Sequence, residues 1–145
     1  MNQFVEFIKG DRQPGLYGVT GEIKVEELSS LCLKHSFQFF HIEGKDIVSK
    51  TDFLKASAKA MSFPEYFGNN WDALEDCITD LDWVAANGYI LLYTQPEIFA
   101  RNNPSELATA IDILRSAVEY WQETNTPMFV LIKANNLDIK NLEIL

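Results

Sequence analysis

The chain of 145 residues has the length of one domain, and its 47% hydrophobic content supports a packed core and argues against disorder. Twelve basic residues stand against 21 acidic ones, and the net charge of −9 argues against nucleic acid as a partner and favours a basic one. No run approaches the roughly 20 apolar residues that span a membrane, and the N-terminus lacks the apolar segment of a secretory signal, so we expect a cytoplasmic protein.

Hydrophobic periodicity predicts strands that alternate with helices along the chain. In chain order we expect a strand at 16–19, a helix at 25–33, a strand at 37–42, helices at 49–61 and about 70–81, a strand at 89–93, a helical turn at 96–101, a long helix at 104–123 and a strand at 128–132. Residues 134–145 carry no clear pattern. This alternation favours a small parallel sheet covered by helices.

Polar motifs predict where several helices begin. The segment Ser49–Asp52 fits a capping box. Asn103 is expected to cap the long helix, because Pro104 follows it in the first turn and Glu106 occupies the third helical position. A loop at 65–70, with Gly68 and two asparagines suited to a tight turn, leads into the helix at 70–81.

The negative charge is concentrated between residues 60 and 100. This segment contains seven acidic residues and no Lys or Arg, so it carries −7 of the net −9. Helical spacing divides the predicted helix 70–81 into two faces. The acidic face consists of Asp72, Glu75, Asp76 and Asp80. The apolar face consists of Trp71, Ala73, Leu74, Cys77, Ile78 and Leu81.

The acidic face is costly for an isolated helix. Asp76 lies four residues from both Asp72 and Asp80, and like charges at this spacing cost about 0.2–0.5 kcal/mol per pair. A charged face is most often only solvated. Here no cation relieves the repulsion, and the preceding loop adds Glu65 and Tyr66. Aromatic side chains beside unpaired charges are typical of protein-binding surfaces, so we interpret the acidic face as one.

The segment FPEYFGNNWDALEDCITDLDW, residues 63–83, resembles the signature of the barstar family of intracellular ribonuclease inhibitors. Residues 64–70 are similar to the inhibitory loop of the family, and residues 72–79 to its inhibitory helix. The resemblance covers about residues 37–134. It implies an α/β fold with a small three-stranded parallel sheet packed with helices. Residues 1–36 would then form an N-terminal strand–helix extension packed on this core, and 135–145 a C-terminal tail.

The resemblance implies an inhibitor and not an enzyme, without metal or cofactor. Its partner would be a basic ribonuclease or nuclease toxin, held in a one-to-one complex, and its carboxylates would take the places of RNA phosphates in the cationic active site. The residues that match the family's loop and helix, or add charge beside them, are Tyr66, Gly68, Asn70, Asp72, Glu75, Asp76 and Asp80. Glu75 stands where the family prototype has tryptophan. A second acidic contact on the long helix could come from Glu119 or Glu123, or Tyr120 could stand at that position.

Other functions stay open from the residues alone. The acidic face could serve a non-inhibitory interaction or regulatory module that binds another basic protein. Its carboxylates could also bind Mg²⁺ or act as acid and base, but one helix face offers no pocket of converging groups. Three mixed ligands without a clear fourth, Cys32, His35 and His41, are weak support for a metal site. Trp83 and Trp121 are expected to pack, with an interface role open.

Overall fold

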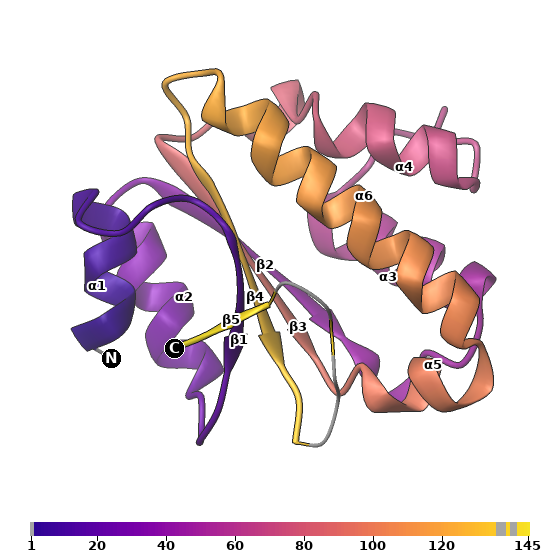
Figure 1. Cartoon of the computed structure of the whole chain (residues 1–145). Helices are drawn as coiled ribbons and strands as arrows, with labels where there is room; N and C mark the ends of the chain where they lie inside the picture. Colours follow the sequence, from indigo (N-terminus) through magenta and orange to yellow (C-terminus); the bar gives the residue numbers. More distant parts are fainter. Residues whose placement is uncertain (1, 136–138, 140–141) are drawn as a thin grey trace.

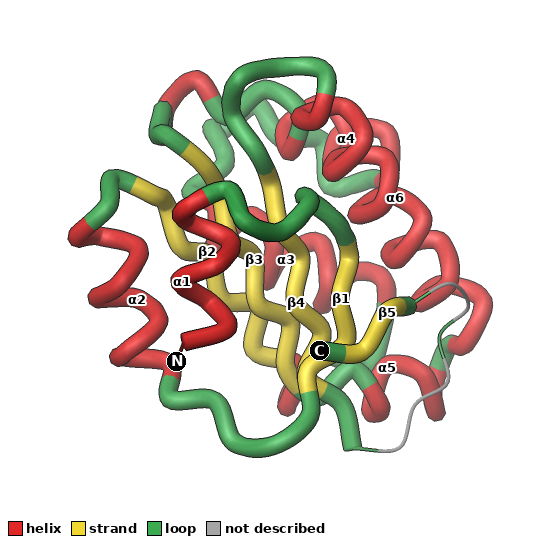
Figure 2. The backbone as a smooth tube through the Cα atoms, turned by 60° about the vertical axis from the view of Figure 1, so that its left-hand side comes forward, coloured by secondary structure: helices red, strands yellow, loops and turns green. Residues whose placement is uncertain are grey.

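The computed structural model describes residues 2–135, 139 and 142–145. A parallel sheet of five strands in the order β2-β3-β4-β1-β5 forms its central layer (Figures 1 and 2). The strands are β1 Leu16–Val19, β2 Phe37–Glu43, β3 Gly88–Thr94, β4 Met128–Lys133 and β5 Glu143–Ile144.

Helices cover both faces of the sheet (Figure 1). One face carries α1 Asn2–Lys9 and α2 Val25–Lys34. The other face carries α3 Lys50–Met61, α4 Trp71–Ile78, α5 Glu97–Asn102 and α6 Pro104–Gln122, together with the short 3₁₀ helices η1 Gly44–Asp46 and η2 Asp82–Val84. The result is a three-layer α/β/α architecture, and its parallel sheet covered by helices confirms what the alternation of elements predicted.

The sheet divides the hydrophobic core into two clusters. Along β3, Tyr89, Leu91 and Tyr93 pack with α3, α4, α5 and α6, whereas Ile90 and Leu92 pack with α1 and α2. Both sets are almost completely buried. The uninterrupted apolar run of this strand therefore reflects burial on two faces, which is typical of a central parallel strand.

The expectation of a three-stranded sheet is wrong, because β1 and β5 extend the sheet beyond β4. Leu16 of β1 lies opposite Val130 of β4, and Gly18 of β1 lies opposite Ile144 of β5. Without β1, β4 would leave a row of backbone groups unpaired at the edge of the sheet. Neither α1 nor β5 was predicted. Of the C-terminal tail 135–145, residues 136–138, 140 and 141 lie outside the described residues.

Helix boundaries test the predicted caps. The Ser49 hydroxyl accepts a hydrogen bond from the Asp52 amide at 3.2 Å, which confirms the cap of α3. Asn103 occupies the N-cap of α6 and Pro104 the first turn, as predicted, but the Asn103 side chain makes no capping bond and instead donates to the Val48 carbonyl at 3.0 Å. Helix α4 ends at Ile78 and not at residue 81, because the chain turns and Leu81 has a φ of 52°.

Among the helices in the described residues, none combines the length and the apolar character needed to span a bilayer.

Candidate protein-binding site

Helix α4 is attached to α6 near both of its ends. The indole N–H of Trp71, the first residue of α4, donates to Glu106 Oε2 at 3.3 Å. The indole N–H of Trp121, near the end of α6, donates to the carbonyl of Ile78 at 2.9 Å. Ile78 is the last residue of α4, and its carbonyl has no acceptor role within the helix. Two side-chain bonds therefore fix the position of α4.

The apolar face of α4 points into the core, as helical spacing predicted. Leu74 and Ile78 are completely buried and Cys77 is 4% exposed. Trp71 is partly buried and packs against the same cluster. With this face inward, the four side chains of the acidic face are exposed to solvent.

The loop before α4 uses its polar groups to build the helix N-terminus. The side-chain oxygen of Asn70 accepts from the Ala73 amide at 2.8 Å, and its nitrogen donates to the Gly68 carbonyl at 3.3 Å. Asn69 supplies the left-handed turn, with a φ of 52°. Two of the residues predicted to bind a partner, Gly68 and Asn70, thus have a local structural role in shaping the loop and capping α4.

Tyr66 lies in this loop and is 73% exposed. The pKa of its phenol is raised, first by partial desolvation and then by Asp80, Cys77 and Asp82. The loop itself is anchored because Phe67 is buried and its ring lies 4.9 Å from that of Phe63.

The carboxylates of the acidic face have no cationic partner in the described part of the chain. The ion pairs found there join Arg12 to Glu6 and Glu143, Lys24 to Glu27, and Lys45 to Glu43. At the end of the face, Asp80 accepts only a hydrogen bond from the Asp82 amide, at 3.3 Å. Asp72, Glu75 and Asp76 are therefore exposed negative charges on a fixed helix, whereas Asp80 lies in the turn after α4 and not on the helix.

The last turns of α6 hold two of the three residues named for a second contact, Glu119 and Tyr120, and the third, Glu123, follows as the C-cap. Glu119, Tyr120 and Glu123 are all exposed, and 49% of Tyr120 is accessible. The Tyr120 ring meets the Trp121 ring at 5.3 Å and 88°, an edge-to-face contact. The hydrogen bond from Trp121 to Ile78 brings this end of α6 to the C-terminal end of α4.

The side chains suggested as metal ligands do not come together. No group of three or more His, Cys, Asp or Glu side chains in the described residues is arranged to hold a metal ion. Cys32 is buried, which raises the pKa of its thiol to about 12. His41 Nε2 forms a hydrogen bond with Thr94 Oγ1 at 3.0 Å, and His35 is exposed at another edge of the molecule.

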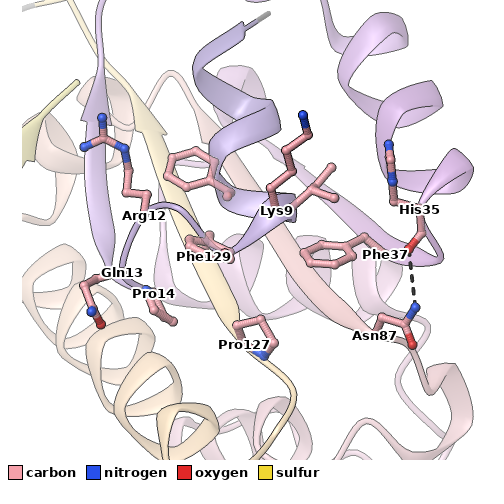
Figure 3. A pocket seen from close by; sticks show the side chains of 12 residues that line it. Lys9, Arg12, Gln13, Pro14, His35, Phe37, Asn87, Pro127 and Phe129 are labelled. Atoms are coloured by element: carbon pink, nitrogen blue, oxygen red, sulfur yellow. Dashed lines mark hydrogen bonds between the residues drawn. The ribbon is translucent and has the colours of Figure 1, made fainter.

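The surface also has a hollow of about 470 Å³, whose lining includes no residue of the acidic face; Figure 3 shows its side chains from close by. It opens where α1 ends and where strands β1 to β4 begin, with Phe7, Phe37 and Phe129 in its lining. Lys9, Arg12 and His35 also line it, but Arg12 is already paired with Glu6 and Glu143. No local pattern of residues predicts this hollow, because its lining comes from segments far apart in the chain.

The fold and the site define a class: an α/β protein that presents carboxylates from one fixed helix on a three-layer scaffold. A family model described as barstar (barnase inhibitor) matches residues 37–133. The chain belongs to this family. Comparison with curated proteins gave no match. The matched region contains β2, β3, β4 and α3 to α6, whereas α1, β1, α2 and β5 lie outside it.

Proposed function

We propose that this chain inhibits a basic ribonuclease of the barnase type by placing the acidic face and Tyr66 over the cationic active site of the enzyme, in a one-to-one complex. One observation carries the proposal: the carboxylates of α4 are exposed and lack cationic partners within the described residues, on a helix tied to α6 at both ends. Membership of the barstar family supports the same function at family level.

The chemistry of the target explains why a carboxylate helix would inhibit it. A ribonuclease must hold cations where phosphate charge develops during cleavage. Carboxylates can occupy these positions and form charge-assisted hydrogen bonds to Arg, Lys or protonated His. Because α4 is already held by Trp71 and Trp121, little conformational freedom would be lost on binding. Such a complex would protect the producing cell from a nuclease toxin.

The residues of the site would have different roles. Asp76 lies in the middle of the acidic face and is the proposed anchor, with Asp72 one turn before it. Glu75 and Asp80 would add negative potential on either side. Tyr66 would contribute an aromatic contact, while Gly68 and Asn70 hold the loop that carries it.

The test is a titration of barnase activity on RNA with the purified chain, at low and at high salt. We expect stoichiometric inhibition that weakens as salt screens the charges. Asp76→Ala should weaken inhibition about tenfold or more, because a charge-assisted hydrogen bond contributes about 1.5–3 kcal/mol. Glu22→Gln removes an exposed carboxylate far from α4 in the sequence and serves as the matched control.

Two results would contradict the proposal. The first is no inhibition of barnase by the wild-type chain at micromolar concentration. The second is an Asp76→Ala variant that inhibits as strongly as the Glu22→Gln control. The first result would favour the non-inhibitory interaction module, in which the same acidic face binds a different basic protein. The second would show that inhibition does not depend on the Asp76 carboxylate and would overturn the proposed site.

A further inference from the structure

The two edges of the sheet differ in length. One edge is β5, which has two residues, and the other is β2, which has seven (Figure 2). Among the described strands, β2 pairs only with β3, so the other side of its backbone presents N–H and C=O groups without a strand partner. An open edge accepts a further strand, and proteins therefore shorten or block their edges. The β5 edge is short, whereas the β2 edge is long.

The usual blocking devices are missing along β2. Residues 37–42 include no Lys, Arg, Asp, Glu or Pro. Every residue of β2 lies opposite one residue of β3 in unbroken register, so no bulge twists the strand away. Three of its residues are phenylalanine, which is enriched in strands. The outer edge of β2 is therefore regular, uncharged and suited to pairing with another strand.

An apolar side chain is exposed beside the start of this edge. Leu33, near the end of α2, is 81% exposed. It lines a hollow of about 520 Å³ together with Phe37 and Gln38 from the first residues of β2. At this accessibility Leu33 adds little to the core of its own chain, and its burial against another chain would be favourable. The edge and the hollow form one surface that a second strand and its neighbours can cover.

The distribution of charge permits a second copy of this chain at the β2 edge. Most of the net charge of −9 is carried by residues 60–100. Between residues 33 and 48, in contrast, two lysines and two acidic residues cancel. The acidic helix α4 packs on α6 and α3, on the outer side of that helical layer (Figure 1). Two copies that meet at β2 therefore join neutral surfaces and leave both acidic faces open.

The side chains of β2 complement one another about a twofold axis. If two β2 strands pair antiparallel with the axis near Phe40, Phe39 of each copy lies opposite His41 of the other. Within one chain these two rings lie 6.4 Å apart, and both side chains are partly exposed. The pairing would thus join four rings into one cluster across the new interface. Phe39 packs on the face of the sheet that α2 covers, and α2 also carries the exposed Leu33.

We propose that this chain forms a twofold symmetric homodimer through its β2 edges, so that the two sheets join into one continuous sheet. Closed twofold dimers are the commonest oligomers of soluble proteins. One strand pair with its flanking side chains is a small interface compared with the roughly 1,200–2,000 Å² of stable complexes, so we expect association at micromolar concentration. The dimer does not depend on the proposed inhibition, because each copy would still present its own acidic face.

Sedimentation velocity of the full chain between about 5 and 500 µM tests the dimer without any ribonuclease. The wild type should change from monomer to dimer, with a Kd of about 10–100 µM. Leu33→Glu and Gln38→Lys each place a charge at the edge and should raise this Kd about tenfold or more. Ile144→Glu is the matched control, because it adds a charge at an exposed apolar residue of the β5 edge. Its Kd should stay within about twofold of wild type.

Amide hydrogen exchange followed by NMR at low and at high protein concentration locates the contact. The outward N–H groups alternate along a strand, so alternate residues of β2 should exchange more slowly as the dimer forms. Circular dichroism and urea unfolding should show that Leu33→Glu and Gln38→Lys fold as the wild type does. Loss of the dimer in these two folded variants, together with slower exchange along β2, would support the proposal.

Several outcomes would overturn the β2 dimer. One is a wild-type chain that stays monomeric at about 500 µM. Another is a dimer that persists in both Leu33→Glu and Gln38→Lys, or one that only Ile144→Glu disrupts, since the contact would then lie elsewhere. Association that continues beyond two copies would also contradict the proposal, because a twofold pair uses up both β2 edges.

Discussion

Single tryptophan side chains determine where the elements around the acidic face lie. The indole N–H groups of Trp83 and Trp121 donate to the carbonyls of Met61 and Ile78, each at 2.9 Å. These carbonyls belong to the last residues of α3 and α4, where the helices can no longer supply a donor. Both indole rings therefore pack against apolar side chains, and each also supplies the hydrogen-bond donor that the last carbonyl of a helix lacks. Their position explains how a site made of exposed charges can have a fixed shape.

At the scale of single residues, His41 should make the free energy of unfolding depend on pH. Burial lowers the pKa of His41 below its usual 6.5, although Glu43 opposes the shift. The unfolded chain then binds a proton more readily than the folded chain. The stabilisation from neutral His41 is complete above about pH 6.5 and is lost as the pH falls toward the lower pKa of the folded state.

Urea unfolding between about pH 5 and pH 8 tests this expectation. The free energy of unfolding of wild type should fall more steeply below pH 6.5 than that of His41→Gln, which cannot be protonated. His35→Gln, at an exposed histidine, is the control and should behave as wild type. The same pH dependence in wild type and His41→Gln would show that His41 does not contribute.

At the scale of the element, repulsion between like charges makes helix α4 less stable than its buried side chains alone would make it. Asp72 and Asp76 are exposed like charges four residues apart, and no basic residue occupies the last turn. Asp76 also lies close to the negative C-terminal end of the helix dipole. The buried side chains of Leu74 and Ile78, each contributing about 1.5–3 kcal/mol, offset this repulsion. The helix keeps its charges at the expense of its own stability, as is common at binding sites.

Neutralising the central carboxylate should therefore stabilise the free protein. Asp76→Asn should raise the free energy of unfolding by about 0.5–1 kcal/mol, because it relieves repulsion from Asp72 and the unfavourable dipole contact. The measurement is urea denaturation, with Glu22→Gln as a control that removes one charge elsewhere and should change stability less. The same Asp76→Asn variant should inhibit barnase poorly. A destabilised Asp76→Asn would contradict this account of α4.

At the scale of the whole molecule, the net charge of −9 acts on folding and on binding in opposite directions. In the folded chain, negative charges are brought together and repel one another. In the proposed complex, the same charges attract a basic partner. Salt screens both effects, since the Debye length falls from about 10 Å at 0.1 M to about 3 Å at 1 M.

We therefore expect sodium chloride to stabilise the free chain and to weaken the complex. The free energy of unfolding should rise between about 0.05 M and 0.5 M salt, while the inhibition constant against barnase rises over the same range. Unfolding by urea and inhibition assays in identical buffers measure the two trends. Sucrose, an uncharged stabiliser, is the control, because it should stabilise the chain without the same loss of inhibition. A fall in stability with salt would contradict the role of charge repulsion.

Patterns among neighbouring residues were enough to predict most elements and the orientation of α4. The predicted strands at 37–42, 89–93 and 128–132 correspond to β2, β3 and β4 within two residues at each end. The separation of α4 into a buried apolar face and an exposed acidic face also followed from the sequence. Periodicity and capping are properties of consecutive residues, so they can be recognised without knowledge of the fold.

Contacts between distant residues were decided only by the tertiary structure. Asn103 stands at the N-cap of α6, but its side chain bonds to Val48, 55 residues away along the chain, and not to the helix. The number of strands depended on the pairing of β1 with the free side of β4 and of β5 with β1. The acceptors of the Trp83 and Trp121 indole groups depended on where α3 and α4 end. Backbone and indole groups have no sequence-coded preference for one partner. Burial requires that they find an acceptor, and the topology determines which acceptor is within reach.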